Sequence, residues 1–194
     1  MRKIVSFVHL SLDGFVAAAD GGLGWVSITE ELFDHVGQRI QQTDTALYGR
    51  VTYQMMEAYW PTAAAQPNAS KHDLEHSRWY KTARKVVLSK TLAEKYGNNT
   101  KIIRDHISEE INKLKQEVGS EVLVFGSPSA THALMEEDII DEYWIFLNPV
   151  LLGQGIPLFK NIKHRTPLKL VTSKTFASGV VCLSYEVQRH SRGE

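Results

Sequence analysis

The sequence predicts an α/β protein built on a mostly parallel mixed sheet, with helices on both faces and an antiparallel hairpin at the C-terminal end. Short runs of apolar and β-branched residues alternate with segments of helical periodicity along most of the 194 residues, an order that is typical of a parallel sheet. Near the end of the chain two strand-like runs, residues 168–176 and 180–187, flank Ala177-Ser178-Gly179. This pattern indicates a terminal hairpin at an antiparallel edge.

The N-terminal half opens with an apolar run over residues 4–10 that predicts the first strand, and a glycine-rich loop containing Asp13-Gly14 follows it. Residues 29–41 predict an amphipathic helix, because four apolar side chains share one face: Leu32, Phe33, Val36 and Ile40. The other elements of this half are a strand at 45–48, a short helix from Arg50, an irregular stretch with two prolines at 59–69, a polar helix at 71–81 and a strand at 85–88.

The C-terminal half begins with a strand at residues 101–103 and an amphipathic helix whose apolar face carries Ile107, Ile111, Leu114 and Val118. Its opposite face is charged, so the helix is expected to pack against the sheet rather than to act in chemistry. The elements before the hairpin are a strand at 122–125, a helix at 130–137 and a strand at 142–147.

Composition limits the classes of function. Lysine plus arginine (22) balances aspartate plus glutamate (22), which removes the broad electrostatic argument for nucleic acid or for an anionic membrane surface. The single cysteine, Cys182, rules out an intrachain disulfide and a multi-cysteine metal site, and it fits a reducing compartment. His9 and Asp13 interrupt the first apolar run, so no signal peptide or membrane span is expected. We expect one cytoplasmic domain over residues 1–194.

Two turns have the chemistry of a phosphate site. The strand at 122–125 runs into Gly126-Ser127-Pro128-Ser129, in which a serine and a proline precede a helix. Such a helix start offers unpaired N–H groups and a positive dipole end to an anion. The same order recurs at Gly49-Arg50-Val51-Thr52, so the ligand is expected to carry more than one phosphate. The alternatives are an ordinary capped helix at the first turn and a solvated arginine at the second.

Five segments occur in an order that belongs to a known family: 11–17 (Ser-Leu-Asp-Gly-Phe-Val-Ala), 49–53 (Gly-Arg-Val-Thr-Tyr), 87–90 (Val-Leu-Ser-Lys), 125–129 (Phe-Gly-Ser-Pro-Ser) and 148–159, which starts Asn-Pro-Val-Leu-Leu-Gly. On these segments the chain resembles the dihydrofolate reductase superfamily, and specifically stand-alone proteins similar to the reductase domain of the bifunctional riboflavin-biosynthesis deaminase-reductase. The resemblance spans nearly the whole chain. It implies a three-layer dihydrofolate-reductase-like fold and an NADPH-dependent reductase that is usually a homodimer.

The resemblance also assigns residues to the cofactor. Gly126, Ser127, Pro128 and Ser129 match the turn that holds the pyrophosphate, although Ser127 stands where relatives often have a second glycine, and a cis peptide at this junction is compatible with the family. Gly49, Arg50 and Thr52 match a second phosphate site, for the 2′-phosphate or the pyrophosphate. Leu88, Ser89 and Lys90 match residues around the adenosine 2′-phosphate, though without the family context they would be an ordinary loop. Gly14 lies in the loop that covers the nicotinamide.

The candidate catalytic residues are two carboxylates. Asp13 could orient substrate or water, or simply cap its turn. In the folate reductases a carboxylate on the first helix serves the pterin ring, and Glu30 is the candidate here because Glu31 and Asp34 point away from the apolar face. Ser27 to Glu30 also spells a capping box, in which Glu30 would serve its own helix.

The remaining reactive side chains favour structural roles. His72 and His76 are four residues apart on a helix and are expected on a solvated face, so no metal site is predicted. Cys182 lies in a strand and is expected to be a buried structural thiol.

The best-named activity is that of a 5-amino-6-(5-phosphoribosylamino)uracil reductase, acting on a small pyrimidine or pterin-like substrate. In the riboflavin-pathway relatives an acidic residue often precedes the two glycines of the pyrophosphate turn, whereas this chain has Phe125 before Gly126. The single cysteine also cannot supply the zinc site of the deaminase partner. One alternative is a dihydrofolate or pterin reductase, which a buried Glu30 would favour. Another is a nucleotide-binding sensor without turnover, which a nicotinamide face blocked by Trp25 or Tyr53 would favour.

Overall fold

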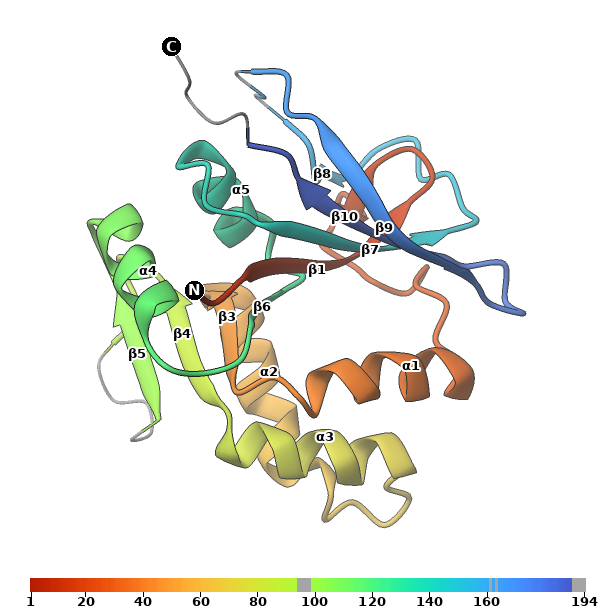
Figure 1. Cartoon of the computed structure of the whole chain (residues 1–194). Helices are drawn as coiled ribbons and strands as arrows, with labels where there is room; N and C mark the ends of the chain where they lie inside the picture. The colour runs from red at the N-terminus through yellow and green to blue at the C-terminus, as the bar shows by residue number, and fades with distance from the viewer. Residues whose placement is uncertain (94–98, 161, 163, 190–194) are drawn as a thin grey trace.

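The computed structural model describes residues 1–93, 99–160, 162 and 164–189. Its main sheet has eight strands in the order β5-β4-β3-β6-β1-β7-β10-β9 (Figure 1). Six strands from β5 to β7 run parallel, and the hairpin β10–β9 is antiparallel to β7, as predicted. The strands are β1 (Ile4–Ser11), β3 (Thr45–Gly49), β4 (Arg84–Leu88), β5 (Thr100–Ile103), β6 (Val122–Phe125), β7 (Glu142–Asn148), β9 (Leu168–Thr175) and β10 (Val181–Val187).

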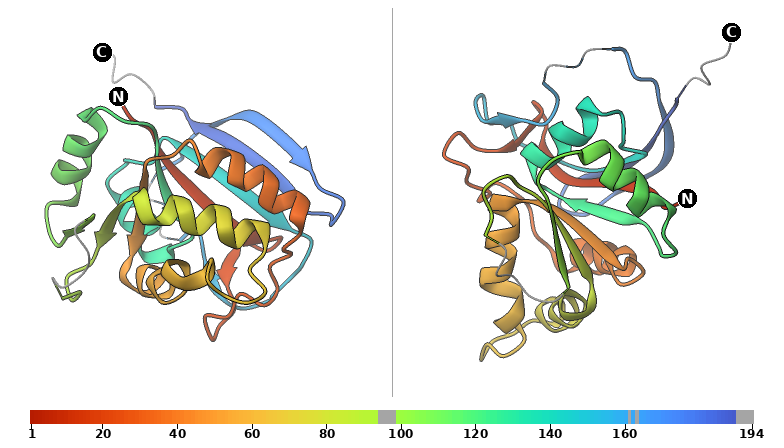
Figure 2. Two further views of the ribbon diagram at one scale, coloured as in Figure 1. Left: turned by 90° about the horizontal axis from the view of Figure 1, so that it is seen from below. Right: turned by 90° about the vertical axis from the view of Figure 1, so that its left-hand side faces the viewer.

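Helices cover both faces of this sheet, and Figure 2 shows the resulting three layers. On one face α1 (Glu30–Ile40), α2 (Arg50–Ala63) and α3 (Lys71–Thr82) pack on a core rich in aromatic rings. On the other face α4 (Ile107–Gln116) and α5 (Pro128–Glu136) pack on an aliphatic core. Alternate residues of β6 enter the two cores: Leu123 and Phe125 face the first, Val122 and Val124 the second. The predicted fold class is therefore confirmed.

The structure corrects two expectations about local structure. The helix from Arg50 is not short: α2 continues to Ala63 with Pro61 inside it. Pro61 donates no helical hydrogen bond, but Trp60 and Ala63 on either side of it pack against the core and hold this last turn in place. The loop after β1 also contains a strand, β2 (Phe15–Ala17), which pairs with β8 (Ile156–Pro157) in a second small sheet.

The start of α1 differs from the predicted capping box. Thr29 is the N-cap, and its hydroxyl accepts from the amide of Leu32 at 3.3 Å. Glu30 is therefore the first helical residue and not the third, so it cannot return a bond to Ser27. The Ser27 amide instead donates to the side chain of Asn148 at 2.9 Å, which ties the loop before α1 to the end of β7.

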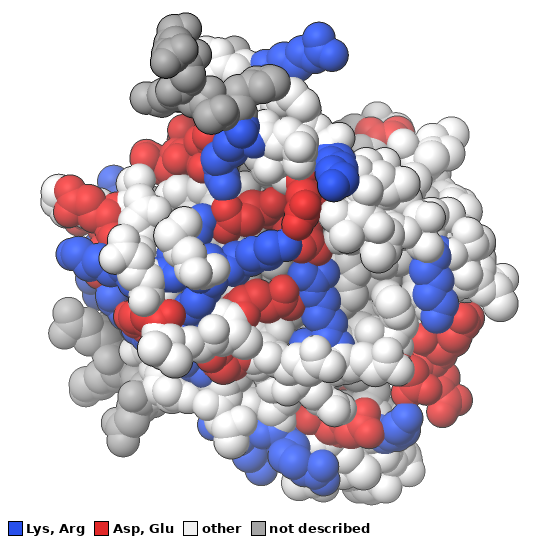
Figure 3. Space-filling model, viewed as in Figure 1, with Lys and Arg blue, Asp and Glu red and all other residues white. Residues whose placement is uncertain are grey.

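Charges of both signs are mixed on the surface of the protein. Acidic and basic side chains are interspersed over the face shown in Figure 3. Within the described part of the chain, no helix has the length and apolar character needed to cross a membrane.

The expectation that His72 and His76 lie on a solvated helix face is wrong. His76 is buried, with its ring 3.9 Å from that of Trp60, and His72 stacks on Phe33 at 3.7 Å. Burial disfavours the charged imidazolium and lowers the pKa of His76 to about 3. The two histidines do lie on one helix, as their spacing predicted. Because α3 packs between α1 and α2, the histidine rings contact Phe33 of α1 and Trp60 of α2 and are not on a solvated face.

This burial predicts a loss of stability in mild acid. His76 stays neutral in the folded state while it takes up a proton in the unfolded state below its ordinary pKa of 6.5, so the free energy of unfolding falls as the pH drops from about 6.5. The loss is about 1.4 kcal/mol per pH unit for each such histidine. Urea unfolding of the wild type and of His76→Phe between pH 7 and pH 5 measures it. The variant is expected to have a shallower pH dependence, and equal slopes would contradict the assignment.

Candidate functional site

The two turns predicted to bind phosphate lie side by side at the carboxyl ends of adjacent strands. Gly49 ends β3 and Ser127 follows β6, its neighbour in the sheet. The Ser127 hydroxyl accepts a hydrogen bond from the amide of Gly49 at 2.8 Å, and both groups are buried. Gly49 and Ser127 are also the N-caps of α2 and α5, and neither helix start has a side-chain cap. Both helices thus direct uncapped first-turn amides to one place.

The turn formed by residues 126–129, called the cradle below, begins with a glycine in an unusual backbone conformation. Its φ is +55°, a left-handed conformation that residues other than glycine adopt at a cost, and no heavy atom lies within 4 Å of the position that a Cβ would take. Its amide donates to the carbonyl of Phe7 on β1 at 2.8 Å. The glycine therefore leaves open space beside the start of α5. The described peptide bonds are all trans, that between Gly126 and Ser127 included.

Ser127 has a different function from the one its position suggested. It occupies the N-cap of α5, yet its side chain makes no bond to that helix and binds Gly49 across the two turns. A side chain at Gly49 would overlap Ser127 Oγ and lie 2.8 Å from Ser129 Oγ. A larger residue at position 49 would therefore displace the Ser127 side chain and disturb the bond between the two turns.

The predicted cationic residues lie at the same edge of the sheet as this pair of turns. Arg50 begins α2, is exposed, and donates to the side chain of Gln54 at 3.0 Å, while Thr52 is half-buried in the same first turn. Lys90 is exposed beyond the end of β4, with its ammonium 3.8 Å from Asp105. Because β4 is the neighbour of β3, both cations belong to the same edge of the sheet.

Leu88 and Ser89 lie where β4 ends in a local turn. Leu88 is the half-buried last residue of β4, and the Ser89 hydroxyl accepts from the amides of Thr91 and Leu92 at 3.2 and 3.0 Å. Ser89 therefore forms a local turn, as in the ordinary-loop interpretation, and Lys90 is the residue of this motif that faces outward.

Asp13 fastens one loop to another. Its carboxylate accepts from the Ser11 hydroxyl at 2.6 Å and from the amides of Gly153 and Leu152 at 2.7 and 3.1 Å. These bonds, first that from Ser11, hold the pKa of Asp13 below its ordinary value. The adjacent Gly14 has a φ of +91° and donates to the Ser11 carbonyl. This geometry matches the turn-capping alternative for Asp13.

Glu30 is exposed at the start of α1, and the structure does not bring it to the paired turns. Its neighbours on α1 are engaged elsewhere: Asp34 binds Lys71 at 2.7 Å, and Glu31 binds Lys174 at 3.4 Å. Cys182 is buried, as predicted, and accepts from the indole N–H of Trp144 at 3.1 Å. No three His, Cys, Asp or Glu side chains of the described chain gather as a metal site would require.

Asn148 is a positioning residue that the sequence did not reveal. It is buried at the end of β7, where its amide donates to the Phe146 carbonyl at 2.9 Å and its oxygen accepts from the Ser27 amide. A buried asparagine directly before Pro149 at a strand end was the available signal, because such a side chain must find several partners. It fixes the loop that leads to α1.

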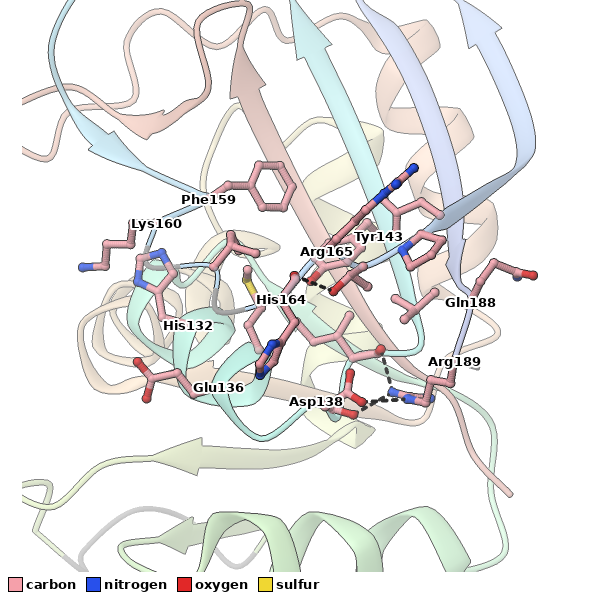
Figure 4. A pocket seen from close by; sticks show the side chains of 17 residues that line it. His132, Glu136, Asp138, Tyr143, Phe159, Lys160, His164, Arg165, Gln188 and Arg189 are labelled. Carbon is pink, nitrogen blue, oxygen red and sulfur yellow. Dashed lines mark hydrogen bonds and ion pairs between the residues drawn. The ribbon is translucent and has the colours of Figure 1, made fainter. Parts of the chain in front are cut away.

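A cavity of about 600 Å³ lies elsewhere in the molecule. It is lined by α5, the start of β7, the end of β10 and residues 159, 160, 162 and 164–168, and Figure 4 shows Tyr143 and Phe159 in its wall. Arg189 at its rim is paired with Asp138 and Asp141. No residue predicted for the cofactor or for catalysis lines this cavity.

The bond between the turns supports a prediction about Ser127→Ala. Removing the hydroxyl leaves the buried Gly49 amide without its acceptor, which costs about 1–2 kcal/mol of unfolding free energy. Ser129→Ala is the matched control, because Ser129 is exposed on the same turn. Urea unfolding of both variants measures the difference, and equal losses would show that the bond does not hold the turns together.

The chain was also compared with known proteins. A family model described as the RibD C-terminal domain matches residues 2–182. The Bacillus subtilis (strain 168) protein YyaP is 33% identical over 186 residues, covering 95% of this chain and 94% of YyaP. A pyrimidine reductase-like protein from Corynebacterium diphtheriae NCTC shares the fold with a TM-score of 0.67 at 15% identity, covering 97% of this chain and 93% of that one. Dihydrofolate reductase from Enterococcus faecalis, complexed with NADP(H) and RAB-propyl, gives a TM-score of 0.62 at 12% identity, covering 96% and 97%. The resemblance found in the sequence is confirmed, and the chain belongs to the RibD C-terminal domain family.

Proposed function

We propose that the protein is an NADPH-dependent reductase. The observation that carries the proposal is the pair of uncapped helix starts joined by the Ser127–Gly49 bond, with open space beside Gly126. Backbone amides at two adjacent helix starts suit a pyrophosphate, which needs several donors at close range. The family supports the same assignment, because it is named for the reductase half of a riboflavin-biosynthesis enzyme.

The residues present fit such a cofactor. The first-turn amides of α2 and α5 and the exposed Ser129 hydroxyl would bind the pyrophosphate, and Arg50 and Lys90 would bind the 2′-phosphate. Gly126 and Ser127 would shape the turn, because their amides already donate to the carbonyls of Phe7 and Phe125. Pro128 has no amide to donate, and it fixes the first turn of α5. When bound, NADPH supplies a hydride to an electrophilic carbon, so the protein has only to orient the substrate and exclude water.

For the substrate we propose the riboflavin-pathway reduction, that of 5-amino-6-(5-phosphoribosylamino)uracil, as the best-named activity. The family supports it. Pterin reduction would have been favoured by a buried Glu30, but that carboxylate is exposed. A sensor without turnover would have been favoured by Trp25 or Tyr53 over the nicotinamide. Tyr53 is buried in the core with Tyr48, and Trp25 is half-buried in its own loop, where its indole N–H donates to the Gly22 carbonyl at 3.2 Å. Asp13 is proposed to act through the loop it fastens, at residues 152–153, rather than as an acid.

The cofactor assignment predicts a preference for NADPH over NADH. Because Arg50 and Lys90 are exposed cations at this edge, NADPH is expected to bind at least about tenfold more tightly than NADH, equivalent to about 1.4 kcal/mol. Arg50→Ala is expected to weaken NADPH and leave NADH almost unchanged. Calorimetric titration of both cofactors measures this. Equal wild-type affinities would contradict the proposal, and parallel losses in the variant would place Arg50 at the pyrophosphate.

We also propose that the protein is a homodimer that associates through β9. Every residue of this edge strand is exposed, among them Leu168, Leu170 and Val171, so the strand presents unpaired backbone groups together with apolar side chains. A second copy would cover both.

The dimer proposal predicts that a charge on β9 separates the protomers. Leu170→Asp is expected to shift the sedimenting species to the monomer, because a carboxylate would be desolvated in the interface. Leu74→Asp is the matched control, since Leu74 is 45% exposed and Leu170 48%, but Leu74 lies on α3. A wild-type monomer, or dissociation by both variants alike, would contradict the proposed interface.

A further inference from the structure

The cavity of about 600 Å³ lies at the other end of the sheet from the paired turns. Its wall includes Tyr143 near the start of β7 and Val187 at the end of β10, whereas the turns follow the carboxyl ends of β3 and β6. The helix α5 connects the two places, because it begins at Pro128 in the cradle and contributes Met135 to the cavity wall. Sites for small molecules typically have volumes of about 300–1,000 Å³, so the cavity is large enough for a ligand of its own.

One buried polar group in the wall of this cavity lacks a partner. Tyr143 is 7% exposed, yet its hydroxyl makes no hydrogen bond to any residue that the structure describes. Burial raises the pKa of Tyr143 to about 12, so the hydroxyl keeps its proton at pH 7 and can donate. A donor removed from water without an acceptor is costly. An acceptor on a bound ligand would satisfy it.

The wall around this hydroxyl is apolar and contains a second aromatic ring (Figure 4). The rings of Tyr143 and Phe159 meet edge to face, with their centroids 5.7 Å apart. Ile140 is buried and Met135 is half-buried, but Phe159 is 43% exposed. Part of the Phe159 ring is therefore accessible, and an aromatic ligand packed against it would remove apolar surface from water on both partners.

The charged residues at the rim favour a negatively charged ligand. Arg189 is already paired with two aspartates. Lys160 and Arg165 are exposed, and neither has an ion pair within the described part of the chain. The carboxylate of the lining that likewise has no ion pair there is Glu136, and Figure 4 shows it on the side of Lys160, with Arg165 on the other side. Arg165 can therefore bind a carboxylate group of a ligand.

We propose that this cavity is a second binding site, which takes an aromatic carboxylate. The ring of the ligand packs against Phe159 and Met135. Its carboxylate accepts a hydrogen bond from the Tyr143 hydroxyl and pairs with the guanidinium of Arg165. This site is separate from the cofactor edge and does not depend on the proposed reductase function.

The test compares 2-naphthoate with 2-naphthamide, which have the same ring system and differ in charge. Each is titrated calorimetrically into the wild type at pH 7, with and without an excess of NADP⁺. We expect 2-naphthoate to bind at least about fivefold more tightly than the amide, and NADP⁺ to change its affinity less than about twofold. Absence of binding, which would also result if a second copy of the chain covered the cavity, overturns the proposal. Equal affinities for the two probes, or displacement of 2-naphthoate by NADP⁺, overturn it too.

The hydroxyl is tested by Tyr143→Phe, which keeps the ring and removes only the donor. This variant is expected to weaken 2-naphthoate about tenfold, because a hydrogen bond to a charged group is lost. Tyr185→Phe is the matched control. Tyr185 is half-buried on β10, the neighbouring strand, but does not line the cavity. The control is expected to change the affinity less than about twofold.

The cation is tested by Arg165→Met, which removes the charge and keeps an unbranched side chain. It is expected to weaken 2-naphthoate at least about fivefold and to change the affinity for 2-naphthamide less than about twofold. Lys169→Met is the matched control, because Lys169 is exposed on β9 and lies outside the cavity lining. It removes the same charge from the protein as a whole, so it measures any long-range effect of net charge.

The four variants together decide whether the probe occupies this cavity. If Tyr143→Phe and Arg165→Met bind 2-naphthoate as the wild type does, the probe lies elsewhere and the inference is wrong. Equal losses in the test and control variants would show a general effect on the protein and would also overturn it. A thermal melt of each variant verifies that the protein is folded.

Discussion

The hydrogen bond from the Gly49 amide to the Ser127 hydroxyl is the constraint on which the candidate site depends. Parallel pairing of β3 with β6 brings their carboxyl ends to one edge, but it does not fix how the following helices begin. The serine does so, because its hydroxyl is used between the turns instead of on its own helix. The first-turn amides of α2 and α5 therefore stay uncapped and lie together. The absence of a side chain at Gly49 is the condition for this contact.

The same edge of the sheet is held in place by loops that come from distant parts of the chain. Asp13 binds the amides of Leu152 and Gly153, and Asn148 binds the amide of Ser27. These bonds connect the end of β1, the end of β7 and the entrance to α1. The side chains of Asp13 and Asn148 thus hold loops together. For Asp13, a catalytic role was the alternative that the sequence offered. Each bond gives a loop N–H group a side-chain acceptor in place of the backbone carbonyl that a sheet would provide.

The sequence predicted most of the fold because period and turn chemistry are local properties. Alternating apolar runs located the strands of the sheet, and Gly126-Ser127-Pro128 located a helix start, since these residues act through their own backbone. What it missed depends on partners far away in the chain. The pairing of β2 with β8, the burial of His76 and the use of Ser127 between turns all follow from tertiary packing. The helical wheel put Glu30 at the flank of the apolar face, but it could not show that the residue is exposed.

The paired turns and the layer of rings beside them are built from different materials. The turns depend on backbone amides at the starts of α2 and α5 and on the lack of a side chain at Gly49, so their chemistry comes mainly from the backbone. The neighbouring layer consists of side chains, with Phe7 and His9 among packed aromatic rings. Exchange of one such ring alters this layer without breaking the sheet beneath it, because the strand pairing is made by the backbone. The backbone of the turns and the side chains of the ring layer can therefore change independently of each other.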